Sequence, residues 1–276
     1  MDKHAVAHSL EWLEEKTKPL FVVVALVLYA IEVGRIATTM NVLENLDEFL
    51  IAALAGLSIP FSVILMQELL ELVAYISDSN LLSARRQFEI VLLVIVRSFF
   101  KSFSKVNSYV DDGVLGGPVQ EAIVKVLSII ALMFLIHFFR VMAESKHLSW
   151  YSKQGGETNL YKQGLVVILI IFVLIYQLVF VGTFETIDFI RLVFTGLIII
   201  EGLFLIVSIW KGNFGQLVLE SSLVIALIFA RFPLFASNVL SYALSVLGVA
   251  FATTALYLFY RIAQWLAAHP EYVAPE

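Results

Sequence analysis

The sequence contains no cysteine, which excludes disulfide bonds, thiolate metal sites and cysteine nucleophiles. Charged residues are also scarce, at 15% of the 276 positions, whereas soluble domains have about a quarter. The few charges are spread along the chain, so no basic stripe indicates binding to nucleic acid. Hydrophobic residues make up 60% of the chain, an excess that a soluble core of this size could not bury. The composition therefore predicts an integral membrane protein.

Catalytic and cofactor-binding patterns are missing as well. The sequence has no glycine-rich phosphate loop, no His-Glu-x-x-His pair and no Gly-x-Ser-x-Gly turn. His137 is the only histidine inside an apolar stretch, whereas haem or metal ligation needs further ligands at helical spacing. We therefore expect a protein that is not an enzyme, with no cofactor and no metal, and we expect His137 to make a hydrogen bond between helices.

Apolar stretches close to the ~20 residues that cross a bilayer define the fold class. They predict an all-α, polytopic transmembrane bundle of about eight spans, with counts of six or seven left open because the third and seventh contain charge and run short. The second is long enough to tilt or to bend at Pro60, which lacks a backbone N–H. The stretches are 19–40, 49–76, 88–103, 122–142, 165–182, 189–210, 216–232 and 239–260.

Lysine, arginine and tryptophan together predict the orientation of these spans. Lysine and arginine are more frequent in alternate connections, which we assign to the cytoplasmic side. Tryptophan falls on that same side, as expected of an interfacial belt. Both termini are then cytoplasmic, with an N-terminal segment at 1–18 and a tail at 263–276. The four tryptophans are Trp12, Trp150, Trp210 and Trp265.

Two similar halves are visible once the spans are in order. A polar connection at 144–164, containing Gly155 and Gly156, separates four spans at 19–143 from four at 165–262. In each half an even-numbered span with a glutamate leads through a short inner turn to a helix that carries a glutamate and then an arginine. Because both halves have an even number of spans, we expect a parallel repeat about an axis near the membrane normal.

Several charged or polar residues lie inside the apolar spans, where an ionised side chain costs on the order of 3 kcal/mol. One interpretation is a structural network that fixes the register of the helices, and the other is an ion or proton path lined by carboxylates. These residues are Glu68, Glu71, Glu89, Arg97, His137, Arg140, Glu201, Glu220 and Arg231.

The spacing of these charges suggests partners. Glu220 and Arg231 lie eleven residues apart, close to three helical turns, so either Glu220 or Glu201 is expected to pair with Arg231. Glu68 or Glu71 is expected to pair with Arg97 or Arg86. Within single helices, the pairs expected at three- and four-residue spacing are Glu32 with Arg35 and Arg140 with Glu144.

Lys101 and Lys105 follow Arg97 at intervals of four and oppose the positive-inside rule. Voltage-sensing helices carry a basic residue at every third position, so this spacing does not match them. Both lysines are expected to extend toward outer headgroups, where they would form a site for an anionic lipid or solute.

The stretch from Glu68 to Lys101 resembles the phosphate-starvation-inducible E (PsiE-like) family of small bacterial and archaeal membrane proteins. The matching residues are Glu68-Leu69, Val73 and Tyr75, followed by FEIVLLVIVR from Phe88 to Arg97. The second half offers LVLESSLVIALIFAR, from Leu217 to Arg231. Family members are similar to one four-helix half, so the resemblance implies two fused copies with a non-enzymatic role linked to phosphate limitation. It also implies the inner membrane of a prokaryote.

Three functions are compatible with these features. The preferred one is a structural or regulatory subunit of a membrane assembly, with lipid, other membrane subunits or a second copy of the chain as its partners. The second is a small channel or transporter with a path between the repeats. The third, a subunit that carries a redox cofactor or acts on lipid, is disfavoured by the lack of cysteine and the near absence of histidine inside the spans.

Overall fold

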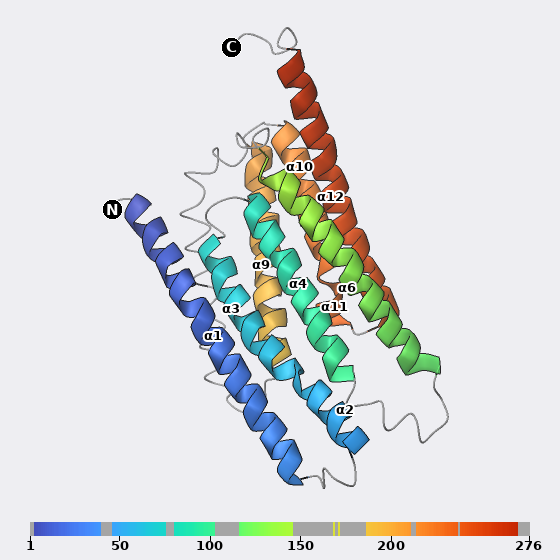
Figure 1. The fold of residues 1–276 in the computed structure, drawn as a ribbon. Helices are drawn as coiled ribbons and strands as arrows, with labels where there is room; N and C mark the ends of the chain where they lie inside the picture. The colour runs from blue at the N-terminus through green and yellow to red at the C-terminus, as the bar shows by residue number, and fades with distance from the viewer. Residues whose placement is uncertain are drawn as a thin grey trace. The chain divides into compact units, whose positions relative to one another are not determined.

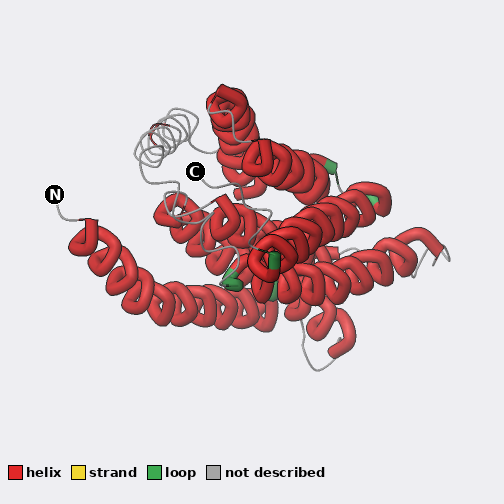
Figure 2. The backbone as a smooth tube through the Cα atoms, turned by 90° about the horizontal axis from the view of Figure 1, so that it is seen from above, coloured by secondary structure: helices red, strands yellow, loops and turns green. Residues whose placement is uncertain are grey.

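The computed structural model describes residues 3–39, 46–75, 80–102, 116–145, 168, 171, 186–210, 214–236 and 238–269. Within these residues the backbone is almost entirely α-helical and contains no β-strand, which confirms the all-α prediction (Figure 2). In order along the chain (Figure 1), the helices are α1 (Lys3–Thr39), α2 (Leu46–Gly56), α3 (Ser58–Tyr75), α4 (Asn80–Ser102), α6 (Gly116–Ala143), α9 (Thr186–Trp210), α10 (Phe214–Ala230), α11 (Phe232–Phe235) and α12 (Val239–Ala268).

Five segments of the described residues are long and apolar enough to cross a bilayer, which indicates a multi-pass membrane protein. The third predicted span lies in α4, where five charged side chains make the helix more polar than these five segments. The sixth lies in α9, and the fifth falls outside the described residues except for Ile168 and Ile171. The total of eight spans and the cytoplasmic termini stay predictions. The five segments are Lys18–Thr39, Leu46–Leu69, Val119–Ala143, Leu217–Phe235 and Val239–Trp265.

The chain forms two compact units, each made of two separate stretches of sequence. The first comprises Met1–Ala74 and Leu92–Ile129, and the second comprises Tyr75–Val91 and Ile130–Glu276. Both α4 and α6 therefore contribute one end to each unit. The division does not fall in the connection at 144–164, and the four-plus-four repeat stays a prediction.

In the first unit, the second predicted span is interrupted close to Pro60. Helix α2 ends at Gly56, Leu57 forms a turn, and α3 begins at Ser58. Pro60 has no N–H to donate to the carbonyl group of Gly56, so the regular helical bond is lost there. The backbone N–H of Leu57 instead bonds to the carbonyl group of Leu54 at 3.2 Å. The bend expected from the sequence is therefore present as a short break.

Polar and aromatic contacts join the helices of the first unit. The hydroxyl group of Tyr29 in α1 donates to the carbonyl group of Ala53 in α2 at 3.2 Å. The rings of Phe61 in α3 and Phe100 in α4 stack with their centroids 5.2 Å apart. Lys125 in α6 is buried and donates to the carbonyl group of Ser98 in α4 at 3.3 Å.

In the second unit, α10 and α12 pack with their backbones in close approach. A Cβ atom added to Gly248 of α12 would lie 2.6 Å from the carbonyl oxygen of Ala226 and 2.8 Å from the amide nitrogen of Ala230. Small residues at such contacts are typical of helix pairs in membranes, where packing rather than water exclusion drives association. Gly248 therefore sets how closely these two helices approach.

We predict that Gly248→Ala destabilises the protein by about 1–3 kcal/mol, because its methyl group would push the backbone of α10 away. Unfolding of the purified protein in detergent, followed by circular dichroism, measures the change. Gly34→Ala in α1 is the matched control, since its Cβ meets no atom of the described residues within 4 Å. Equal stability of the two variants would contradict the tight contact.

Candidate functional site

Arg231 is the central charged residue of the second unit. It caps the N-terminus of the short helix α11, directly after α10 ends, and its side chain is fully buried. Both carboxylate oxygens of Glu201 in α9 lie 3.2 Å from its Nη2 atom. Of the two carboxylates expected to pair with Arg231, it is Glu201 rather than Glu220 that forms the ion pair.

Gln87 connects this ion pair to helix α4. It is fully buried, and its Oε1 atom accepts a hydrogen bond from Nη2 of Arg231. Its Nε2 atom donates to Glu201 at 2.7 Å and to the hydroxyl group of Ser83 at 3.2 Å. The side-chain oxygen of Gln87 therefore accepts a hydrogen bond from the cation Arg231, and its side-chain nitrogen donates one to the anion Glu201.

Phe194 of α9 completes the surroundings of Arg231. Its carbonyl group accepts a hydrogen bond from Nη1 of Arg231 at 3.4 Å, and its ring centroid lies 5.0 Å from the Cζ atom. A guanidinium group over an aromatic face gains a cation–π attraction that is strongest where water is excluded. Within the part of the chain that the structure describes, the Nε atom of Arg231 has no hydrogen-bond partner, so one donor is left unsatisfied there.

This arrangement makes the charges depend on one another. A buried charge is costly, and the attraction of its partner offsets that cost only when both are well hydrogen-bonded. Because the partners come from α4, α9 and the junction of α10 with α11, displacing any one of these elements would leave a charge uncompensated. The network can therefore fix the register of these helices.

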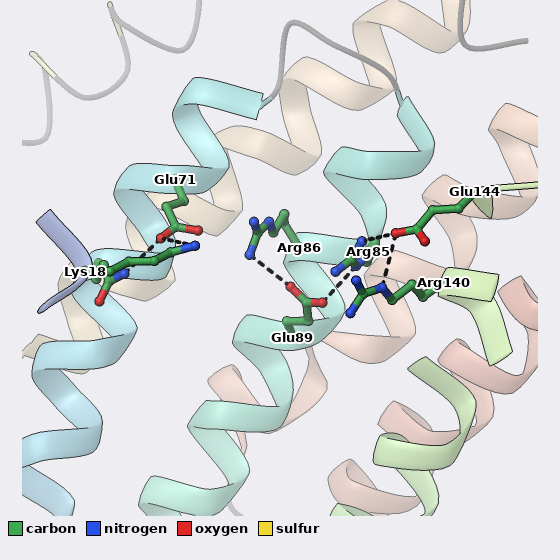
Figure 3. Close-up of polar contacts among 8 residues, drawn as sticks. Lys18, Glu71, Arg85, Arg86, Glu89, Arg140 and Glu144 are labelled. Carbon is green, nitrogen blue, oxygen red and sulfur yellow. Dashed lines mark hydrogen bonds and ion pairs between the residues drawn. The ribbon is translucent and has the colours of Figure 1, made fainter. Parts of the chain in front are cut away.

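A second cluster joins the beginning of α4 to the end of α6 within the same unit, as Figure 3 shows. Arg85 contacts Glu89 at 2.9 Å and Glu144 at 2.8 Å. Arg86 contacts Glu89 at 3.3 Å, and Arg140 contacts Glu144 at 3.1 Å, the latter being an intrahelical pair expected from the sequence. Three guanidinium groups therefore contact these two carboxylates, and Glu144 is shared between Arg85 and Arg140.

A third cluster lies in the first unit, where Lys18 of α1 meets Glu71 of α3 (Figure 3). The lysine Nζ atom is 3.5 Å from Oε1 of Glu71, and Gln67 donates to the same oxygen at 2.9 Å. The expected partner of Glu71 was Arg97 or Arg86. Arg97 donates to the hydroxyl group of Ser62 at 2.6 Å, and the pairing of Glu68 or Glu71 with Arg97 or Arg86 stays a prediction. Lys18, near the middle of α1, is thus a partner that spacing along α3 and α4 did not reveal.

The remaining predicted site residues lie in different environments. Glu220 is buried in α10, and Glu68 is half-buried in α3. Lys101 is exposed near the end of α4, whereas Lys105 lies outside the described residues. His137 is exposed on α6, and among the described residues no hydrogen bond joins it to another helix. The intrahelical pair of Glu32 with Arg35 is present, at 2.6 Å.

Two residues of these clusters, Gln87 and Arg85, are not among the site residues predicted from the sequence. Gln87 is neutral and adjoins the charged pair Arg85-Arg86, so it reads as part of a polar helix end. Arg85 lies between the second and third predicted spans, at 49–76 and 88–103, whereas α4 already begins at Asn80. A signal was present in the four-residue spacing of Arg85 and Glu89, which is typical of pairs on one helix face.

The described residues contain no group of three histidine, aspartate or glutamate side chains that could hold a metal ion. Comparison of the chain with known proteins found no matching family model, no matching curated protein and no matching solved structure. The candidate site is therefore interpreted from its own chemistry.

We predict that Glu201→Gln destabilises the protein by about 3 kcal/mol or more, because it leaves the buried guanidinium group of Arg231 without a counter-ion. Chemical denaturation in detergent measures the loss. Glu144→Gln is the control, since this carboxylate is 48% exposed beyond the end of α6 and should cost about 1 kcal/mol or less. A Glu201→Gln protein as stable as the control would show that the buried pair adds little.

Proposed function

We propose that this protein is a non-enzymatic, multi-pass membrane protein that acts as a structural or regulatory subunit of a membrane assembly. The observation that carries the proposal is the mutual pairing of Arg231, Glu201 and Gln87 in the buried part of the second unit. Such a network holds helices in one arrangement, as a scaffold requires. Its charged groups are bound to each other.

The exposure of α1 supports a role that involves association. Only 11% of the most apolar 18-residue stretch of this helix is buried. Its described side chains expose leucine, valine and isoleucine on several sides. A helix that is apolar all round is stable only in lipid or against other helices. Lipid can cover this surface, and so can a neighbouring membrane subunit or a second copy of the chain.

We also propose the finer assignments of the sequence: an inner membrane of a prokaryote, cytoplasmic termini and two PsiE-like four-helix repeats. The distribution of lysine, arginine and tryptophan supports the orientation. The matching stretches at Phe88–Arg97 and Leu217–Arg231 support the repeats.

A small channel or transporter is the second candidate. It is favoured by Glu201, whose side chain keeps 19% of its surface exposed while its partner Arg231 is fully enclosed. A partly exposed carboxylate inside an apolar helix is the kind of residue that lines ion pathways in membrane proteins.

Purification in mild detergent, with identification of co-purifying proteins, tests the proposal. We predict a partner in fixed ratio, either another membrane protein or a second copy of the chain. Vesicles that contain the purified protein should show no proton or potassium flux above empty vesicles. A monomer with clear flux that Glu201→Gln abolishes and Glu144→Gln leaves intact would contradict the subunit role and support the channel.

A further inference from the structure

One face of α6 combines an apolar surface with polar groups at its end. Six residues at three- and four-residue spacing share this face and are all exposed, so they form one continuous strip along the second half of the helix. The segment belongs to a candidate span, so the strip faces an apolar environment over most of its length. The six residues are Ile130, Met133, Phe134, His137, Arg140 and Val141.

The charged end of this strip carries the exposed guanidinium group of Arg140. Arg140 is 53% exposed and lies within one turn of Ala143, where α6 ends. Its Nε atom contacts Glu144, but Glu144 is also held by Arg85 at 2.8 Å, and Glu89 is held by Arg85 and Arg86. Because the carboxylates are shared in this way, the exposed guanidinium group of Arg140 is only partly neutralised. An anion at this position would give Arg140 a partner that it does not share with Arg85.

His137 adds a polar group to the same face, one helical turn from Arg140 toward the apolar part. It is exposed, and among the described residues it has no hydrogen bond to offset the loss of water. A polar side chain without a partner in an apolar environment is costly. A ligand with oxygen atoms at this depth would supply the missing partner.

We propose that this face of α6 binds an anionic phospholipid. The phosphate group contacts Arg140 beside the cluster of Arg85 and Arg86, and a phosphate or ester oxygen accepts a hydrogen bond from His137. One acyl chain lies along Phe134 and Ile130. Free phosphate shares the headgroup chemistry but has no group to cover the apolar strip, so the lipid is the ligand that fits both ends.

Titration of the delipidated protein in detergent with phosphatidylglycerol tests this proposal, with binding counted by native mass spectrometry. We expect phosphatidylglycerol to bind more tightly than phosphatidylcholine. Arg140→Gln should weaken phosphatidylglycerol binding about fivefold, as expected for one arginine near an anionic headgroup. His137→Leu should also weaken it while leaving the melting temperature of the lipid-free protein unchanged.

Arg35→Gln is the matched control, because Arg35 is also exposed near the end of a span but is balanced one to one by Glu32. It should leave phosphatidylglycerol binding unchanged. Equal binding of the two lipids, an equal loss in Arg35→Gln, or displacement of the lipid by millimolar inorganic phosphate would overturn the proposal. If Arg140→Gln does not fold, His137→Leu decides: unchanged phosphatidylglycerol binding in that variant overturns the site.

Discussion

The ion pair between Arg231 and Glu201, completed by Gln87, is the interaction on which the arrangement of the second unit depends. A guanidinium group that is fully buried must meet its counter-charge and hydrogen-bond acceptors within the protein. Here they come from α4 and α9, while Arg231 itself lies where α10 gives way to α11. Because the buried charge is costly without these partners, α4, α9 and the end of α10 must stay in the positions that bring them together.

The close contact of α10 with α12 constrains the end of α10, which directly precedes Arg231. Gly248 faces the backbone of Ala226 and Ala230, and Ala230 directly precedes Arg231 in the chain. A side chain larger than hydrogen at position 248 would shift the end of α10 and with it the guanidinium group. Packing and electrostatics therefore constrain one helix end together. This combination favours a fixed scaffold over a path that must open.

Long-range partners were harder to predict than helices. Runs of leucine, isoleucine and valine predict the all-helical fold, and the missing N–H of Pro60 predicts the break after Gly56. Spacing along one helix also predicts local pairs, as Arg140 with Glu144 shows. It does not reveal that Lys18, more than fifty residues away, meets Glu71, because that depends on how α1 packs. The exposed position of His137 depends in the same way on which face of α6 contacts its neighbours.

The clusters have distinct physical roles in this interpretation. The buried pair holds helices together, whereas the arginine-rich cluster at the end of α6 keeps a partly neutralised charge beside an exposed apolar strip. A double-mutant cycle with Arg231→Gln and Glu201→Gln, measured by unfolding in detergent, tests the central role of the buried pair most directly. We predict a coupling free energy of about 2 kcal/mol or more between the two residues. Losses of stability that simply add, with no coupling, would contradict it.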